Sequence, residues 1–150
     1  MNNKKTSQLD EILKTATLES YEKFVEEELP SDPPALSDYL NSIIGQKGLI
    51  LADVIRKSLL SPDYAYAIFN GNRKNPTKDR LLALCLAMEM DLADAQRALK
   101  ICNAGTLYAK DRRDALIMIC FNTGEFNVMK LNQVLNEYGL PVLKTSKEAD

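Results

Sequence analysis

Histidine is absent from this chain, and cysteine is scarce. Without histidine there is no imidazole acid or base, no Ser-His-Asp triad and no metal site with histidine ligands. The three cysteines lie far apart on apolar stretches and have no Cys-x-x-Cys spacing, which excludes zinc and thioredoxin-like motifs. We expect Cys85, Cys102 and Cys120 to be small buried thiols in a reducing compartment, and we expect neither a metal nor another cofactor.

Groups that accompany catalysis are missing as well. The chain has no glycine-rich phosphate loop, and carboxylate pairs such as Asp111 and Asp114 have no nucleophile or histidine base to work with. We interpret Arg112, Arg113 and Asp114 as surface ion pairing at the start of a helix, with a small charged site as the alternative. We therefore predict that this protein is not an enzyme.

No apolar run is long enough to cross a bilayer. The longest apolar-rich run, LLALCLAMEM, covers only residues 81–90. The first residues, MNNKKTSQLD, lack the apolar segment of a secretion signal. We expect a cytoplasmic protein that does not associate with a membrane.

The composition is that of a soluble globular protein. The chain has 150 residues, of which 45% are hydrophobic and 27% charged, and this length suits one domain with a single core. The net charge of −2 is uneven: residues 1–35 hold four Lys and eight acidic residues, whereas residues 36–91 and 92–150 each carry +1. DNA-binding domains are usually more basic, because neutralising phosphates supplies much of their affinity, but charge clustered on one face can act in the same way.

Apolar residues recur at helical spacing through most of the chain, which predicts an all-α protein. Residues 1–33 are expected to form an N-terminal helical arm, with helices beginning near Ser7 and Thr17. The sequence PSDPP at residues 30–34 breaks the pattern and separates the arm from the core. The second helix of the arm has an acidic face, which we expect to be solvated; packing on a second subunit or repulsion of DNA is the alternative. This acidic face comprises Glu19, Glu22, Glu26 and Glu27.

Residues 34–105 are predicted to form the core. Its first helix has an apolar stripe and ends between Gly45 and Gly48. A later helix, capped by Thr77, is apolar nearly all round and is expected to be the central buried helix. Another helix begins at Asp91.

Residues 106–143 are predicted to form a C-terminal helical extension packed on the core. It opens with LYAKDRRDAL, and the β-branched and aromatic residues that follow would also suit a strand. Asp111 and Asp114 near the start and Gly124 at the end favour a helix.

The last predicted helix begins at Asn127 and ends at Gly139 and Pro141. The tail that follows, KTSKEAD at residues 144–150, is expected to be disordered.

Residues 49–76, LILADVIRKSLLSPDYAYAIFNGNRKNP, predict two short helices joined by a tight turn. Ser61 suits the N-cap of the second helix and Pro62 its first position, where the missing N–H has no partner to lose. Gly71 suits the end of that helix, and a basic loop follows. Helix, turn, helix and basic loop together make a helix-turn-helix arrangement.

With these features, residues 36–100 resemble the Cro/C1-type helix-turn-helix proteins. The positions that match the family pattern are Leu49, Val54, Ser61, Pro62, Ile68, Gly71, Arg73, Pro76, Leu81, Leu82 and Ala87. Residues 107–143 also resemble the C-terminal extension of a bacterial subgroup of these regulators. The resemblance implies a lambda-repressor-like helix-turn-helix core with extra helices at both ends.

In this family the second helix of the motif lies in the major groove of DNA. By position, the residues that would meet base edges are Asp63, Tyr66, Ala67 and Asn70. The residues expected to contact the phosphate backbone are Lys47, Asn72, Arg73, Lys74 and Lys78. Tyr64 and Phe69 are instead expected to pack toward the core with Ile68.

The resemblance thus implies a sequence-specific transcriptional regulator whose partner is double-stranded DNA. Because one such unit covers few base pairs, we expect a homodimer on a palindromic site. Its dimer surface would come from the N-terminal arm or from residues 107–143.

Three departures from the family pattern support an alternative. Leu51 stands where a Gln often bonds a phosphate, Leu59 where the turn usually holds Gly, and Phe69 where Glu is common. The alternative is a protein-interaction module that keeps the scaffold but binds a protein partner in place of DNA. Leu51, Asp63, Ala67 and the acidic arm favour it.

Overall fold

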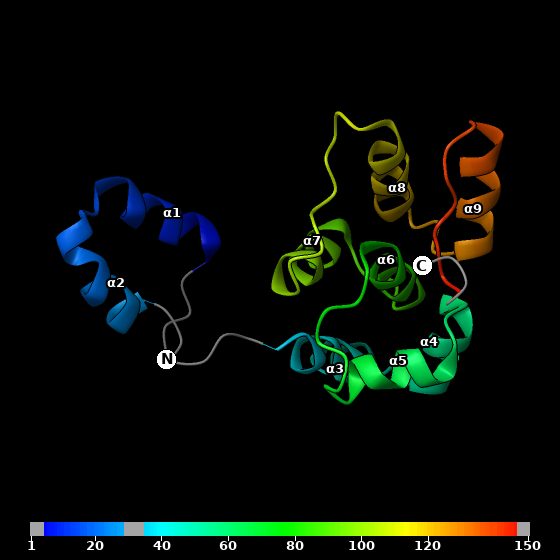
Figure 1. Ribbon diagram of the computed structural model, residues 1–150, viewed down its shortest axis with the longest axis horizontal. Helices are drawn as coiled ribbons and strands as arrows, with labels where there is room; N and C mark the ends of the chain where they lie inside the picture. Colours follow the sequence, from blue (N-terminus) through cyan, green and yellow to red (C-terminus); the bar gives the residue numbers. More distant parts are fainter. Residues whose placement is uncertain (1–4, 29–34, 147–150) are drawn as a thin grey trace. The chain divides into compact units, whose positions relative to one another are not determined.

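The chain is all-α in the residues that the computed structural model describes, 5–28 and 35–146, and no strand occurs in either range. The chain divides into two compact units, Met1–Pro33 and Pro34–Asp150. Figure 1 shows the helices of each unit.

The first unit consists of α1 (Thr6–Thr15), a 3-10 turn (Leu18–Ser20) and α2 (Tyr21–Glu28). Thr17 caps the turn as predicted: its hydroxyl accepts from the Ser20 amide, and the Ser20 hydroxyl accepts from the Thr17 amide. No side chain in these elements is buried, and that of Leu18 is 97% exposed. A segment this short cannot enclose a core by itself. The predicted PSDPP break at residues 30–34 lies outside the described residues.

The second unit contains seven helices within residues 35–146. They are α3 (Leu36–Lys47), α4 (Leu51–Ser58), α5 (Pro62–Phe69), α6 (Lys78–Ala87), α7 (Leu92–Ile101), α8 (Arg112–Thr123) and α9 (Val128–Glu137). Five of them begin at a residue whose side chain accepts a bond from an amide three positions on, which satisfies a donor that the helix leaves unpaired. These caps are Ser61, Thr77, Asp91, Asp111 and Asn127.

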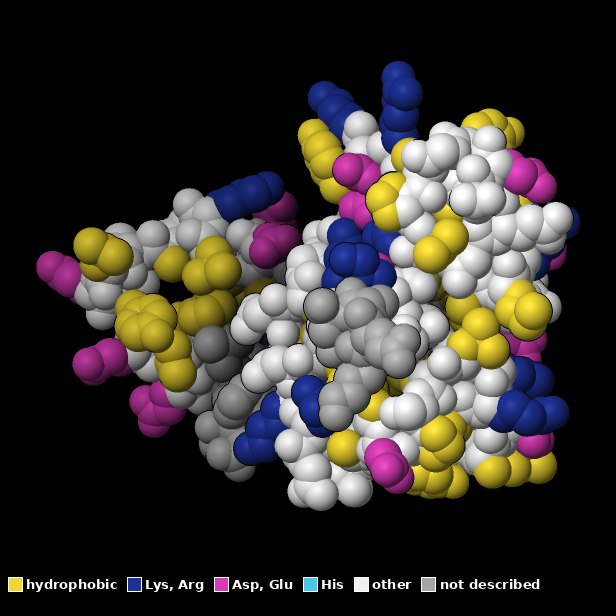
Figure 2. Space-filling view, turned by 45° about the vertical axis from the view of Figure 1, so that its right-hand side comes forward, with side chains coloured by type: hydrophobic (Ala, Val, Ile, Leu, Met, Phe, Trp, Pro, Cys, Tyr) yellow, Lys and Arg dark blue, Asp and Glu magenta, His cyan; other side chains and the backbone are white. Residues whose placement is uncertain are grey.

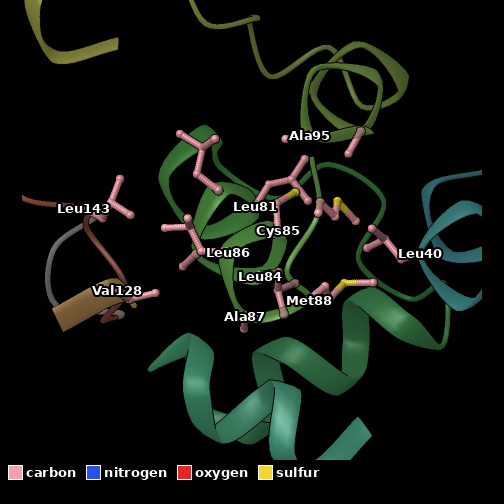
Figure 3. Close-up of a cluster of buried hydrophobic side chains, with 14 of the residues drawn as sticks. Leu40, Leu81, Leu84, Cys85, Leu86, Ala87, Met88, Ala95, Val128 and Leu143 are labelled. Atoms are coloured by element: carbon pink, nitrogen blue, oxygen red, sulfur yellow. The ribbon is translucent and has the colours of Figure 1, made fainter. Parts of the chain in front are cut away.

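Helix α6 is the centre of this unit, as its apolar character predicts. Every side chain from Arg80 to Ala87 is buried, and α6 packs on α4, α7 and α9. In Figure 1, α3, α4 and α5 lie on one side of α6 and α8 and α9 on the other. Figure 3 shows the side chains that follow Arg80 pointing in several directions, with Leu81 toward Ala95 of α7, Leu86 toward Val128 of α9 and Met88 on the side of Leu40 of α3.

The C-terminal extension packs on the core through α8 on α7 and α9 on α6. The apolar segment that would also suit a strand is the helix α8, which ends at Gly124 in a left-handed conformation. Helix α8 begins at Arg112, so LYAK lies outside it. Within LYAK, the backbone N–H of Leu107 donates to Gln96 Oε1, and its carbonyl accepts from Gln96 Nε2. These bonds to α7 replace the ones that a helix would supply.

The end of the described chain, residues 141–146, is here called the C-terminal segment. The Leu143 side chain is buried, and its amide donates to Asn132 Oδ1 at 2.8 Å. The Lys144 amide donates to Asp79 Oδ2 at 2.9 Å, and Arg80 Nη2 donates to the Ser146 carbonyl at 2.8 Å. The prediction of disorder is therefore wrong for residues 144–146, because contacts with α6 order them; residues 147–150 lie outside the described residues.

The three cysteines are free and buried, as predicted. Burial raises the pKa of each thiol, most strongly for Cys85 on α6, because the charged thiolate loses its hydration there.

The free energy of unfolding should therefore fall in alkaline solution. As the pH rises, the thiols of the unfolded chain ionise at about pH 8.5, before those of the folded chain. The contribution of the thiols to the free energy of unfolding is therefore constant below that pH and decreases above it. Each thiol contributes at most about 1.4 kcal/mol per pH unit in this window. The measurement is urea unfolding at pH 7 and pH 10 with a reductant present. Cys85→Ala should have a shallower pH dependence, and an unchanged slope would contradict this account.

Candidate nucleic-acid interface

The turn between α4 and α5 is short and tightly held. Leu59 adopts a left-handed backbone conformation, with a φ of 64°, which is unusual for a residue with a side chain. The buried hydroxyl of Ser58 donates to the Ile55 carbonyl at 2.6 Å and accepts from the Leu60 amide at 3.2 Å. Leu60 is itself buried. The angle between α4 and α5 is therefore set by buried groups on both sides of Leu59.

Helix α5 is anchored by its inner face. Ala65, Ile68 and Phe69 are buried, and Asn41 of α3 donates from Nδ2 to the Phe69 carbonyl at 2.8 Å. Ser61 caps the helix through the Tyr64 amide, and Pro62 takes the first position, both as predicted. The helix is therefore held as a rigid element by α3 and the core.

The outer face of α5 carries the four residues that were expected to meet bases. Asp63, Tyr66 and Asn70 are exposed, and Ala67 is half-buried. Their spacing puts them on one side of the helix. Asn70 Oδ1 accepts from the Asn72 amide at 2.9 Å, so a paired contact with a base edge would use its second lone pair together with the Nδ2 donors.

A cationic loop follows α5 directly. Gly71 has a φ of 86°, the left-handed conformation that lets the chain leave the helix, and the Arg73 amide donates back to the Ala67 carbonyl at 2.9 Å. The Arg73 guanidinium lies 4.4 Å from the centre of the Tyr64 ring. Asn72 and Lys74 beside it are exposed. Arg73 is thus held in place next to the outer face of α5.

Tyr64 has a role that the sequence did not reveal. It packs against the core, as predicted, but it is only half-buried, and its hydroxyl accepts from the Thr77 amide at 3.3 Å. The guanidinium of Arg80 also lies 4.4 Å from its ring centre. One aromatic ring therefore contacts two cations from different elements, and each contact is stabilised by the electron-rich face of the ring.

A cleft of ≈ 330 Å³ lies beside this ring. It is lined by Ser61, Asp63, Tyr64, Ala67, Arg73, Arg80 and Thr145. The cleft therefore joins the N-terminal half of α5, the loop, α6 and the C-terminal segment. Arg80 is its buried member, with 4% of its surface exposed.

Two lysines that were expected to contact phosphates have bonds within the protein. Lys78 Nζ lies 3.0 Å and 3.2 Å from the carboxylate oxygens of Asp114 on α8, and it also donates to the Thr106 carbonyl. Lys47 Nζ donates to the Glu89 carbonyl. The structure thus gives both ammonium groups hydrogen bonds within the protein.

The prediction of surface ion pairing is wrong for Arg113 and Asp114, whose ion pairs are largely buried. Asp114 is buried and accepts from the Tyr108 amide at 2.9 Å in addition to Lys78. Arg113 makes a two-pronged contact with Asp79, at 3.0 Å and 2.9 Å. These two pairs connect α8 to the first turn of α6. Because both are shielded from solvent, removing one partner would leave the other charge poorly solvated.

The positive charges do not form a broad basic surface on the face that Figure 2 shows. Figure 2 shows Lys and Arg side chains of the second unit in separate groups, with acidic and apolar side chains between them. The cations that line the cleft beside α5 are Arg73 and Arg80.

Residues 5–28 and 35–146 include no cluster of three or more carboxylates and thiols that would hold a metal ion. In the same ranges, no helix has both the length and the apolar character needed to cross a membrane. Comparison with known proteins gave no match to a family model, to a curated protein or to a solved structure.

Proposed function

We propose that this protein is a sequence-specific DNA-binding regulator with a lambda-repressor-like core, in which α4 and α5 form the helix-turn-helix. The observation that carries the proposal is the rigid, outward-facing α5 with a cationic loop directly after it. Such a helix can enter the major groove while the loop meets the backbone of the same duplex.

The residues divide by the kind of contact they can make. Asn70 would bond adenine through its amide, Tyr66 would contact a thymine methyl or a phosphate, and Asp63 would accept from cytosine N4. Ala67 leaves room for a thymine methyl. Phosphate contacts would come from Asn72, Arg73 and Lys74, which position the protein without reading sequence.

The contact between Arg73 and Tyr64 supports this division. A guanidinium already held against a ring loses less conformational freedom when it binds a phosphate than a mobile side chain does. Lys74 is exposed and supplies a second cation to the same stretch of backbone. Under this proposal both loop cations contact the backbone of the duplex and help to fix the register of α5.

The test is to separate backbone contacts from base contacts. Replacing Arg73 and Lys74 by alanine should weaken binding to every duplex and reduce the log–log salt slope by about one to two units, because fewer counterions are released. Asn70→Ala should cost about 1–3 kcal/mol on the preferred site only, because one paired base contact is lost. The measurement is titration at several salt concentrations, with a site selected from random duplexes and with random DNA.

A matched control removes the same charge elsewhere. Lys100 and Lys130 are exposed on α7 and α9, and their joint replacement by alanine should leave the salt slope nearly unchanged. If Arg73 and Lys74 can be replaced without loss of affinity for any duplex, docking of α5 in the groove is wrong.

Sedimentation of the same samples, with and without DNA, tests the expected homodimer. A monomer under both conditions would contradict it.

A protein-interaction module is the second candidate. The internal bonds of Lys47 and Lys78 favour it, because they withdraw two of the cations that DNA binding would use. The exposed carboxylate of Asp63 on α5 favours it too, since an unpaired acid near phosphates is repelled. Failure of the protein to bind heparin or random duplex DNA in low salt would support this function over DNA binding.

A further inference from the structure

We infer that the C-terminal segment is an intramolecular competitor of DNA, which covers Arg80 and lines one side of the cleft beside α5 until a phosphate displaces it. This inference rests on the proposed function. It adds a regulatory contact to the interface formed by α5 and its loop.

The segment is fixed before it reaches the cleft. Arg113 donates to the carbonyls of Pro141 and Val142, at 2.8 Å and 3.1 Å. The buried Leu143 side chain and the hydrogen bond from the Lys144 backbone N–H to Asp79 also hold the segment on the core. Residues 141–144 therefore hold the following residues close to the cleft, at a high effective concentration.

The end of the segment forms part of the wall of the cleft. Thr145 lines it together with Asp63 and Ala67 of α5, and the Ser146 carbonyl accepts from Arg80 Nη2 at 2.8 Å. Arg80 contacts the same ring as Arg73, the cation that the proposed function assigns to a phosphate. A phosphate that reached Arg73 from this side would approach Arg80 as well, and residues 145–146 lie in its way.

For the bond between Arg80 and the segment, the chemistry of the acceptors favours exchange. In this bond the acceptor of Arg80 Nη2 is the neutral Ser146 carbonyl, whereas a phosphate oxygen is charged and forms a stronger bond with a guanidinium. DNA can therefore replace the segment, but only by opening it first. Any closed fraction lowers the apparent affinity in proportion to the population that is open.

The experiment compares two truncated chains with the full chain. One chain ends after Lys144 and lacks residues 145–146; the other ends after Ser146 and keeps them. Both truncated chains are prepared with a C-terminal amide, so that Ser146 keeps a neutral carbonyl. The second chain is the matched control, because both truncations remove the charged residues Lys147, Glu148 and Asp150. Thermal melts verify that all three proteins are folded.

Two readouts are measured on each protein. The first is affinity for random and selected duplexes; the chain ending after Lys144 should bind about tenfold more tightly than the full chain, as expected for removal of a mostly closed state. The second is the rate at which phenylglyoxal modifies Arg80, followed by mass spectrometry, which needs no DNA. This rate should rise when residues 145–146 are removed and should not rise in the chain ending after Ser146.

The outcomes separate this inference from the proposed function. If Arg80 is modified no faster in the shorter chain, the segment does not cover it and the inference is wrong, whatever DNA does. If Arg80 is uncovered but duplex affinity stays that of the full chain, competition is wrong while DNA binding stands. An equal gain in both truncated chains would assign the effect to residues 147–150, against the inference. If no chain binds any duplex, the proposed function fails and the inference fails with it.

Discussion

Replacing Asp114 by alanine is expected to lower the free energy of unfolding by about 3–5 kcal/mol, because it leaves a partly buried charge without its partner. Asp114 is 7% exposed, and it accepts from both Lys78 Nζ and the Tyr108 amide. The variant would therefore leave a cation and a backbone donor unsatisfied at the junction of α6 and α8. Urea unfolding of the two proteins at neutral pH measures the difference.

An exposed ion pair on α4 is the control for Asp114. Arg56 and Asp53 lie 3.1 Å apart with 71% and 50% of their side-chain surfaces exposed. Asp53→Ala should cost less than about 1 kcal/mol, because solvent screens the pair. Should Asp114→Ala prove as mild as Asp53→Ala, the extension is not held to the core by this pair.

The same pair offers a test of the role of Lys78. If its ammonium serves α8 and not DNA, Lys78→Met should lower stability while the salt slope of DNA binding stays that of the unmodified protein. Combining Lys78→Met with Asp114→Ala should cost less than the sum of the single changes, since each single change leaves the other charge unpaired.

Phe69→Ala is expected to cost about 3–5 kcal/mol, because it removes a large side chain from the core and leaves a cavity. Phe69 is 5% exposed, and its helix α5 is also tied to α3 through the bond from Asn41 to the Phe69 carbonyl. Because the side chain lies on the buried inner face of α5, the loss of stability should appear in thermal and urea melts of the protein without DNA.

Tyr66 provides a matched aromatic on the same helix. Its side chain is 44% exposed on the outer face, so Tyr66→Ala should change stability by much less than Phe69→Ala. Under the proposed function, Tyr66→Ala should instead weaken binding to the preferred duplex. Equal loss of stability in the two variants would mean that the inner and outer faces of α5 are assigned incorrectly.

The C-terminal extension is connected to the loop after α5 through Asp79. Asp79, in the first turn of α6, binds Arg113 of α8 and the Lys144 amide. The loop with Arg73 and Lys74 enters α6 at this point. Under the proposed function, the extension and the C-terminal segment therefore set the position of the loop cations, and changes in α8 should reach the DNA-binding surface through Asp79.

The sequence by itself determined where the helices of the second unit lie and which way α5 faces. Ser61, Thr77 and Asn127 are caps because a side-chain oxygen reaches an amide three residues away, and this interaction depends only on neighbouring positions. The helical spacing likewise predicted that Ile68 and Phe69 are buried while Asp63 is exposed. The start of α8 was less certain from sequence, because LYAK gains its hydrogen bonds from Gln96 on α7 and not from its own turn.

Only the tertiary structure decided which charged groups meet. Lys78 and Asp114 are 36 positions apart, and Arg80 and Ser146 are 66 positions apart, so no local pattern links either pair. A lysine or arginine has nearly the same sequence signal whether it faces a phosphate, a carboxylate or a carbonyl, because its long side chain can reach in many directions. The packing of α8, α9 and the C-terminal segment on α6 selects among these partners. That packing pairs Lys78 with Asp114 and Arg80 with the Ser146 carbonyl.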